Sequence, residues 1–458
     1  MIATLFSIGI TVVSILILAQ SAHTLYLALY AWNRPPSDSQ APDAFIRPRL
    51  SFTVMLPARH EEEVIQTTIE RVARANYPPQ LLQIMVICSA DDQGTIGEAK
   101  KKIVELRRQG LANISIVIFD DTPINKPHGL NKALPKATNH VVTIFDAEDD
   151  VHPDIFNVIN TIMVTEKVKV VQGGVQLMDY DSKWYSSLNV LEYFFWFKSR
   201  LHYHAREGAI PLGGNTVFIA RELLVRIGGY DELNLTEDAD MGLRLSTLGE
   251  QVRVVYDDRY VTKEETPPSL KSFVKQRTRW DQGFMQTLKK GTWKLLPTRK
   301  QRLLAAYTLA FPYTQAVLGG YFLFSILTML LGVKVPILVA LISYLPVLML
   351  TANMVMSVVG LYEFTAAHGL KATPRNALRL VLAYLPYQIV LAFAAWRATS
   401  RYLRGVSTWE KTQHTGAHRG TASAPAPAAT PAATAPAAAF ARTPVVAATS
   451  PEGAQRAA

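Results

Sequence analysis

The chain has 458 residues, 49% of them hydrophobic, and its 47 basic and 37 acidic side chains give a net charge of +10. This length suffices for one large domain with further segments. The positive charge does not indicate nucleic-acid binding, because Lys and Arg gather near apolar stretches and no RNA-binding motif or recognition helix is found. The single cysteine, Cys88, excludes an intrachain disulfide and fits a reducing compartment.

Four stretches carry no Asp, Glu, Lys or Arg: residues 1–33, 303–333, 335–362 and 380–396. The first three exceed the roughly 20 apolar residues that a helix needs to cross a bilayer. Residues 1–33 lack a leading basic residue and are longer than the core of a signal peptide, so we expect a retained transmembrane helix. The segment of ordinary polarity, residues 49–300, is expected to be one globular domain.

The basic residues after the first stretch, Arg34, Arg47 and Arg49, predict the orientation of the chain. By the positive-inside rule, they place the N-terminus outside and the globular domain in the cytosol. The sequence thus indicates a multi-pass protein of the cell membrane (inner or plasma membrane), surrounded by membrane lipids.

Residues 51–180 alternate between strand-like and helix-like patterns. Strands are expected at Ser51–Pro57, Leu82–Ser89, Ile114–Phe119, Val141–Phe145 and Val168–Leu177, and helices at Glu61–Asn76, Thr95–Gln109, Leu130–Ala137 and Asp154–Glu166. This alternation predicts an α/β domain with a mostly parallel sheet and helices on both faces. Ligands of such sheets bind at the carboxyl ends of the strands, where Asp91, Asp92 and Asp146 stand.

The C-terminal part adds two expected transmembrane helices, at 303–333 and 335–362. The stretch 380–396 has 17 residues and contains Pro386, so it is expected to be either a short transmembrane helix or a re-entrant or interfacial one. We favour the latter, because it keeps the basic run Arg397–Arg404 in the cytosol. Residues 421–458 are rich in Ala, Pro and Thr and are expected to be disordered.

The strand expected at 141–145 ends in four acids within five positions, Asp146-Ala-Glu-Asp-Asp150. Crowded carboxylates are costly unless a cation lies nearby. A hard divalent ion such as Mg²⁺ or Mn²⁺ prefers carboxylate and diphosphate oxygens, so Asp146 and Glu148 are candidate metal ligands. The alternative is a solvated acidic turn before the next helix.

A second acidic segment, Asn234-Leu-Thr-Glu-Asp-Ala-Asp240, precedes an amphipathic helix. Asp238 or Glu237 is a candidate general base, which must be held close to an acceptor hydroxyl. The alternative is that Thr236 caps the helix and the acids favour its N-terminal dipole.

A third segment, Gln276-Arg-Thr-Arg-Trp280, stands shortly before the apolar stretches. An Arg can bind phosphate oxygens in a bidentate manner, and a Trp offers a flat face to a sugar ring. The alternative is an interfacial belt with Arg and Trp at the level of the lipid headgroups.

These segments form part of an ordered set. The set is Pro57-Ala-Arg-His-Glu-Glu62, Asp91-Asp92, Lys126-Pro-His-Gly-Leu-Asn-Lys-Ala133, Asp146-Ala-Glu148, Gly213-Gly-Asn-Thr216, Thr236-Glu-Asp238 and Gln276–Trp280. Over roughly residues 50–290 it resembles the processive branch of family 2 glycosyltransferases, the group of cellulose, hyaluronan and poly-N-acetylglucosamine synthases.

The resemblance implies a GT-A fold and an inverting, metal-dependent transfer from a nucleotide sugar, with a UDP-sugar as the expected donor. It implies donor binding by Pro57, Glu61, Asp91, Asp92, Lys126, Asp146 and Arg279, and metal binding by Asp146 and Glu148. Glu148 departs from the Asp-X-Asp pattern of the family but remains a hard oxygen donor. The implied catalytic base is Asp238, beside Glu237, and the implied acceptor-binding residues are Gly213, Gly214, Asn215, Thr216, Gln276 and Trp280.

The expected product is a growing β-linked polysaccharide, because the Gln-X-X-Arg-Trp motif accompanies processive enzymes. The alternative is a single transfer to a lipid-linked acceptor. Synthases that extrude a polymer usually surround it with more than three or four helices, so an oligomer or a secretion partner is one expectation.

Overall fold

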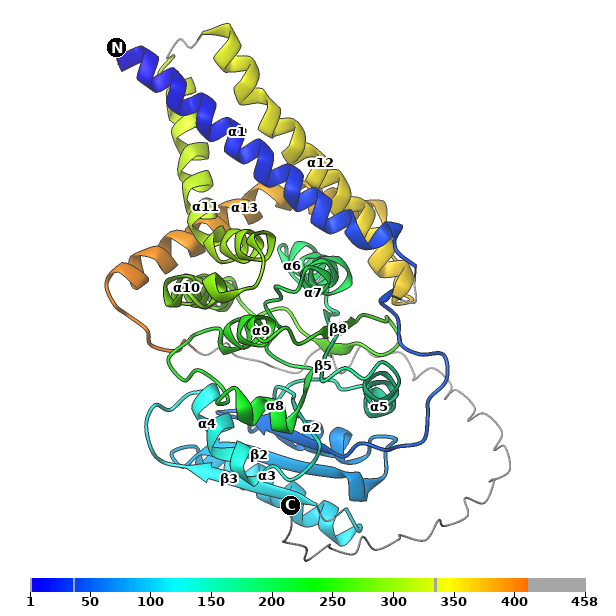
Figure 1. The fold of residues 1–458 in the computed structure, drawn as a ribbon. Coiled ribbons are helices and arrows are strands. Elements are labelled where there is room, and N and C mark those ends of the chain that lie inside the picture. The colour runs from blue at the N-terminus through cyan, green and yellow to red at the C-terminus, as the bar shows by residue number, and fades with distance from the viewer. Residues whose placement is uncertain (1, 36–37, 112, 333–335, 411–458) are drawn as a thin grey trace, which may run out of the picture.

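The computed structural model describes residues 2–35, 38–111, 113–332 and 336–410, so the tail expected at 421–458 lies outside the described residues. Figure 1 shows an α/β domain from which a group of long helices extends to one side. Helices α6, α7, α9 and α10 lie between the sheet and the long helices in this view.

The described residues form a seven-stranded sheet with the order β3-β2-β1-β4-β7-β5-β8. Its strands are β1 (Phe52–Pro57), β2 (Leu82–Ser89), β3 (Ile114–Phe119), β4 (Val141–Ile144), β5 (Val170–Gly173), β7 (Val217–Ala220) and β8 (Val252–Val255). Only β7, between β4 and β5, runs antiparallel to its neighbours. The prediction of a mostly parallel sheet with flanking helices is confirmed.

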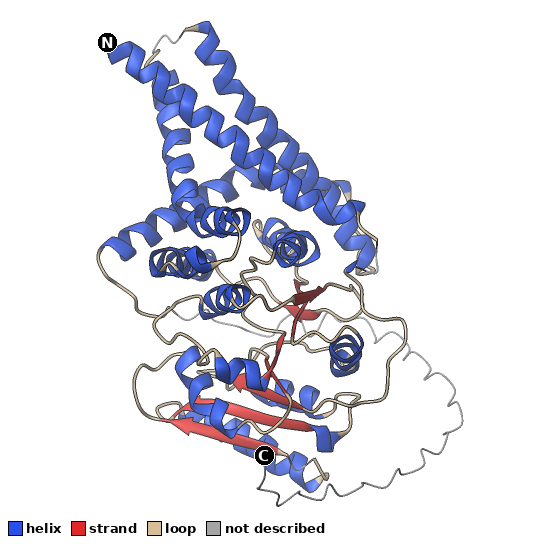
Figure 2. Ribbon diagram, viewed as in Figure 1, coloured by secondary structure: helices blue, strands red, loops and turns tan. Residues whose placement is uncertain are grey.

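The alternation of side chains along β1 separates two layers of core. Phe52, Val54 and Leu56 pack with helices α2 (Ile65–Ala73), α3 (Gln93–Arg108) and α5 (Ile155–Thr165). Met55 belongs to the opposite layer, which contains α4 (Lys126–Ala133), α8 (Arg221–Arg226) and α9 (Glu237–Thr247). Figure 2 shows helices on both sides of the strands. Short 3₁₀ turns occupy Tyr30–Asn33, Pro79–Leu81, Leu134–Lys136 and Thr292–Leu295.

Two predicted elements differ from the structure. The strand expected at 168–177 is interrupted after Gly173, where the backbone lies so close to Thr216 that a side-chain carbon at Gly173 would be 2.6 Å from Thr216 Cγ2. Its second half, β6 (Val175–Leu177), pairs instead with β9 (Thr262–Glu264). The helix expected at 130–137 begins earlier, at Lys126, because the Asn125 side chain accepts a hydrogen bond from His128 N and caps it.

The layer between the sheet and the long helices is built from α6 (Ser186–Phe195), a π-helical turn (Trp196–Arg200), α7 (Leu201–Glu207) and α10 (Leu270–Lys290). The aromatic run of this layer contacts a long helix, since the rings of Phe194 and Phe364 are 5.8 Å apart. Three other members of the run, Tyr193, Trp196 and Phe197, line a cavity instead.

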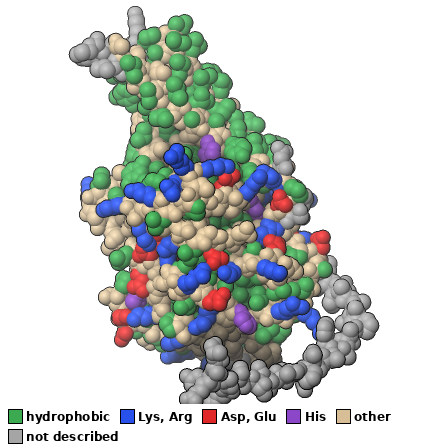
Figure 3. Space-filling view, in the orientation of Figure 1, with side chains coloured by type: hydrophobic (Ala, Val, Ile, Leu, Met, Phe, Trp, Pro, Cys, Tyr) green, Lys and Arg blue, Asp and Glu red, His purple; other side chains and the backbone are tan. Residues whose placement is uncertain are grey.

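The long helices are α1 (Ile2–Leu29), α11 (Arg299–Leu330), α12 (Ile337–Ala367) and α13 (Pro374–Leu403). Among the described residues, three helical stretches are long and apolar enough to cross a membrane: Phe6–Trp32, Ile337–Ala367 and Pro374–Leu403. Helix α11, which covers most of the predicted span 303–333, is not one of them. Figure 3 shows hydrophobic side chains covering the far end of these helices, with Lys and Arg nearer the α/β domain.

Helix α13 corrects the expected length of the segment 380–396. The structure extends it to 30 residues, because the flanking Arg375, Arg379, Arg397 and Arg401 are helical and Pro386 does not end the helix. In Figure 1 the helix does not run alongside α1 and α12 but crosses below them, and it packs on α10. The whole helix, Pro374–Leu403, is nevertheless long and apolar enough to cross a membrane.

Candidate active site

One cavity of about 690 Å³ lies between the carboxyl ends of the central strands and helix α10. The ends of β1 and β4 and the start of α9 contribute to its wall, as expected for a parallel sheet. Most of the predicted site residues line it: Pro57, Glu61, Lys126, Asp146, Glu148, Gly213, Gly214, Asn215, Glu237, Asp238, Gln276, Arg279 and Trp280. Segments as far apart in the chain as Pro57 and Trp280 therefore meet in one space.

The acidic end of β4 is neutralised in part by a lysine. Lys126 Nζ lies 2.5 Å from Asp146 Oδ1 and donates a hydrogen bond to the Gly214 carbonyl at 3.1 Å. Burial alone would lower the pKa of Lys126, but the carboxylates of Asp146 and Glu237 outweigh this and raise it. Lys126 is therefore a permanent positive charge between the strand end and α9.

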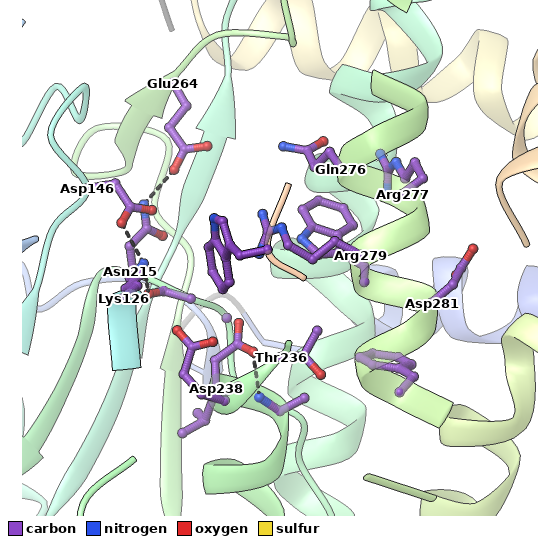
Figure 4. A pocket seen from close by; sticks show the side chains of 18 of the residues that line it. Lys126, Asp146, Asn215, Thr236, Asp238, Glu264, Gln276, Arg277, Arg279 and Asp281 are labelled. Atoms are coloured by element: carbon purple, nitrogen blue, oxygen red, sulfur yellow. Dashed lines mark hydrogen bonds and ion pairs between the residues drawn. The ribbon is translucent and has the colours of Figure 1, made fainter. Parts of the chain in front are cut away.

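Two acids that the sequence did not single out as site residues, the buried Asp149 and the half-buried Glu264, stand beside this pair. The Asn215 side-chain amide donates to both oxygens of Asp149 (3.0 and 2.9 Å) and to Glu264 Oε1 at 2.5 Å. Asp149 Oδ2 in turn accepts from the Asp146 backbone N–H at 2.8 Å. Figure 4 shows Glu264, Asn215 and Asp146 side by side on one wall of the cavity. Asn215 therefore holds the acidic loop, in addition to facing the cavity.

The acidic wall carries more negative charge than Lys126 offsets. Burial and the charges of Glu148 and Asp146 raise the pKa of Glu264 to about 8. Burial and the charges of Glu264 and Asp146 also raise the pKa of Asp149 well above its usual range. A cation bound at this wall would relieve the repulsion among these groups.

The second acidic segment begins helix α9 on the floor of the cavity. Asp238 Oδ1 accepts a hydrogen bond from the Ala239 N–H at 2.8 Å, which orients the carboxylate. Burial raises the pKa of Asp238, and burial with the neighbouring Asp238 charge raises the pKa of Glu237 to about 7. A methyl group at Gly214 would lie 3.1 Å from Asp238 Oδ2, so the glycine lets the backbone approach this carboxylate.

Helix α10 supplies the opposite wall, where Gln276, Arg277 and Arg279 are seen in Figure 4. Arg277 is ion-paired with Glu192, and its guanidinium lies 4.4 Å from the centre of the Trp280 ring. The Arg279 guanidinium lies 4.5 Å from the ring of Trp409, which also lines the cavity. The segment around Trp409 thus folds back to the site.

Three predicted site residues are not at the cavity wall. Thr216 is fully buried and its hydroxyl pairs with Thr262 Oγ1 at 2.8 Å, so the expected acceptor contact is not made by its side chain. Asp91 forms an exposed ion pair with Arg59 at 3.1 Å. Asp92 accepts hydrogen bonds from His60 N (2.6 Å) and Thr95 N (3.2 Å), and thereby holds the loop that carries Pro57 and Glu61.

A glycine of α10 is a further residue that the sequence did not single out. A side-chain carbon at Gly283 would lie 2.4 Å from Thr236 Oγ1 and 2.7 Å from Thr236 N. Helix α10 therefore contacts the start of α9 directly, backbone against backbone. This contact fixes the Gln276–Trp280 segment relative to Asp238.

The fold is shared with a solved glycosyltransferase. A mannosyltransferase from Pyrobaculum calidifontis, whose structure is a complex with GDP-Man and Mn²⁺, superposes with a TM-score of 0.50 at 20% sequence identity. The alignment covers 86% of this chain and 99% of that one. At this identity the likeness concerns the fold.

Curated relatives are glycosyltransferases at low identity. The poly-beta-1,6-N-acetyl-D-glucosamine synthase of Staphylococcus epidermidis is 22% identical over 381 residues, 80% of this chain and 88% of that protein. A probable glycosyltransferase of Bacillus subtilis is 23% identical over 55% of this chain, and a probable glucomannan 4-beta-mannosyltransferase of rice over 62%. The chain spans 59% and 50% of the lengths of these last two relatives.

The family model described as "Glycosyltransferase like family 2" matches residues 48–283. This range contains β1 to β9 and nearly all of the cavity residues discussed above. Because the match covers more than half of the 458 residues, the chain is a member of glycosyltransferase family 2.

Proposed function

We propose that this protein transfers a sugar, with inversion, from a nucleoside-diphosphate sugar to a glycan hydroxyl at the cytosolic face of a membrane. A UDP-sugar is the expected donor. One observation carries the proposal: Asp146, Glu148, Asp238 and Arg279 line a single cavity that also reaches the long helices. Cytosolic orientation follows from the basic residues that flank the apolar stretches.

In the proposed reaction, Asp238 takes the proton of the acceptor hydroxyl as its oxygen attacks the anomeric carbon. The bond from that carbon to the donor diphosphate breaks in the same step, which inverts the configuration. Arg279 and Lys126 offer positive charge to the departing diphosphate. Trp280 and Gln276 hold the acceptor sugar in line, and this orientation contributes a large part of the rate.

Asp146 and Glu148 fit a divalent metal that is shared with the donor. Among the described residues, no set of three or more Asp, Glu, His or Cys side chains is arranged to hold an ion alone. Mg²⁺ is usually held by one or two carboxylates together with substrate phosphates, so two acids suffice here. The metal would stabilise the charge that develops on the diphosphate.

Removal of divalent metal is expected to lower nucleotide release by about tenfold or more, with recovery on addition of Mg²⁺ or Mn²⁺. Asp146→Asn should behave in the same way and should lose metal-dependent UDP binding in calorimetry. Asp154→Asn, which changes an acid outside the cavity that pairs with Asn76, is the matched control. Full activity in EDTA would contradict the metal assignment.

The acidic limb of the pH profile should depend on Glu237. Because burial and the Asp238 charge raise the pKa of Glu237 to about 7, the pair holds a proton at low pH and activity should increase as pH rises. Glu237→Gln removes the neighbouring negative charge, so the pKa of Asp238 should fall and the limb should move to lower pH by about one unit. The measurement is kcat/KM against pH for wild type and Glu237→Gln. An acidic limb at the same pH in both proteins would contradict the interaction between Glu237 and Asp238.

The defining experiment is a screen of UDP- and GDP-sugars with the membrane-reconstituted protein, which reads nucleotide release with and without divalent metal. The length of the radiolabelled product then separates a growing polysaccharide from single transfer to a lipid-linked acceptor. The second candidate is retained because the cavity extends to α1, α11 and α13. An oligomer is expected if the polymer is exported, because this chain has few long helices to surround it. Light scattering of the purified protein tests for such an oligomer.

A further inference from the structure

The cavity continues beyond the catalytic residues to the long helices. Its far wall is formed by residues of α1, α11 and α13: Thr24, Leu27, Tyr307, Thr308, Phe311, Pro312, Gln315 and Leu391. Trp196 and Arg200, from the π-helical turn, line the same space. An acceptor that occupies the whole cavity therefore meets both the proposed catalytic carboxylate and the long helices.

Among the described residues, no side chain pairs with the positive charge of Arg200. In the part of the chain that the structure describes, no hydrogen bond or ion pair to its side chain is found, and its Nε is buried without an acceptor. The nearby acid, Glu192, is already engaged by Arg277 and by Tyr387 Oη at 2.7 Å. A guanidinium stays charged at any physiological pH, and withdrawing it from water unpaired is unfavourable. An anionic ligand in the cavity would supply the missing partner.

The neighbouring residue places Arg200 at the level where α1 ends. Ser199 Oγ donates a hydrogen bond to the Leu27 carbonyl at 2.7 Å and accepts one from Ala31 N at 3.0 Å. Just beyond lies Tyr30, whose ring is 4.8 Å from the Arg34 guanidinium. Tyr and Arg at a helix end mark the headgroup level of a bilayer, so Arg200 lies where lipid phosphates are found.

The cavity that Arg200 lines suits a molecule with a polar and an apolar part. Trp196, Phe311 and Leu391 offer aromatic and aliphatic surface on the side of the long helices. His204, one turn after Arg200, donates a hydrogen bond from Nδ1 to the Ala209 carbonyl at 2.9 Å and lines the cavity as well. Trp280 and Asp238 lie at the catalytic end.

Building on the proposed function, we propose that the acceptor is a lipid-linked glycan whose phosphate binds Arg200. The phosphate at the headgroup level pairs with the guanidinium, which forms bidentate hydrogen bonds with phosphate oxygens. The lipid chain lies toward α1 and α11, and the sugar extends to Trp280 and Asp238. Arg200 is thus a residue that selects phosphate-bearing acceptors and takes no part in the chemistry.

The test uses the full-length protein in phosphatidylcholine nanodiscs and two amphiphiles of equal chain length, dodecyl phosphate and dodecyl maltoside. Binding is followed by the change in tryptophan fluorescence, because Trp196, Trp280 and Trp409 line the cavity. Dodecyl phosphate should bind Arg200→Gln about tenfold more weakly than wild type, and Arg200→Lys should lie between them. Dodecyl maltoside should bind all three alike. The matched control is Arg206→Gln, because Arg206 is on the same stretch but contacts Tyr30 Oη outside the cavity.

Competition separates the sources of phosphate. Displacement of dodecyl phosphate by equal concentrations of inorganic phosphate would indicate a small-anion site, and displacement by phosphatidylglycerol in the nanodisc would indicate a structural lipid site. Either result overturns the acceptor assignment, as does unchanged binding to Arg200→Gln. UDP binding verifies that each variant is folded. If Arg200→Gln does not bind UDP, the affinity of Arg200→Lys for dodecyl phosphate and the competition experiment test the proposal instead.

Kinetics distinguishes this inference from the proposed function. In Arg200→Gln, KM for a phosphate-linked lipid glycan should rise about tenfold, while release of UDP in the absence of acceptor should remain at the wild-type rate. Absence of any nucleotide release from the wild-type protein would contradict the proposed function, and dodecyl phosphate binding would still be measurable. Equal KM values in wild type and Arg200→Gln would contradict the role of Arg200 alone.

Discussion

Asp238→Asn is expected to lower sugar transfer by about a thousandfold while UDP binding stays within about twofold of wild type. The amide keeps the shape of the side chain and its hydrogen bond from Ala239 N, but it cannot take the proton of the acceptor hydroxyl. The substitution does not alter Lys126, Asp146 or Arg279, to which we assign donor binding in the proposed function. Single-turnover transfer of radiolabelled sugar and calorimetric UDP binding measure the two effects separately.

Asp231→Asn is the matched control for this experiment. Asp231 lies shortly before the segment that contains Asp238, but its carboxylate pairs with Lys290 at 2.7 Å and does not line the cavity. We expect this variant to transfer sugar at close to the wild-type rate. Wild-type transfer by Asp238→Asn would end the assignment of the base, and equal loss in both variants would indicate a structural cause.

The parts of the fold that depend on local pattern were predictable from the sequence. Strands β2 and β3 have the expected bounds, because each is an apolar run that ends at a polar turn. The break after Gly173 was not, because it arises from close contacts with Thr216 and Tyr256, which come from distant segments. The length of α13 was also underestimated, because its flanking arginines are helical and the apolar run marks only its middle.

In the site, too, residues in short local motifs were predictable, whereas residues brought in by distant segments were not. Asp146, Asp238 and Arg279 were found because they stand in short motifs, and the structure places all three at one cavity. Glu264 was missed, because nothing in its local sequence distinguishes it before β9 pairs with β6 beside the acidic wall. Thr216 was included because its motif is contiguous, yet its backbone at φ 52° turns the chain there and its side chain is buried. Contiguity in a motif does not specify which side chains face the ligand.

Gly283→Ala is expected to reduce transfer by about a hundredfold, although Gly283 contacts neither substrate. The new methyl carbon would meet Thr236 Oγ1 at 2.4 Å and Thr236 N at 2.7 Å, and the second of these atoms is backbone. Helix α10 must therefore move away from α9, and Trp280 and Arg279 move with it relative to Asp238. Displacements of about 1 Å between reacting groups suffice for such losses. The rate of transfer should fall and KM for the acceptor should rise. The rate of UDP release in the absence of acceptor should fall less.

Gly97→Ala provides the control for a glycine-to-alanine change inside a helix. Gly97 lies in α3, and a side-chain carbon there has no atom of the described structure within 4 Å. The substitution should stabilise the domain by up to about 1 kcal/mol and leave transfer unchanged. If Gly283→Ala also retains full transfer, then α10 tolerates a shift against Thr236. In that case the spacing of α9 and α10 does not align the acceptor with the base. If it loses transfer while UDP binding and thermal unfolding match the control, the packing of α10 on α9 sets the geometry of the reaction.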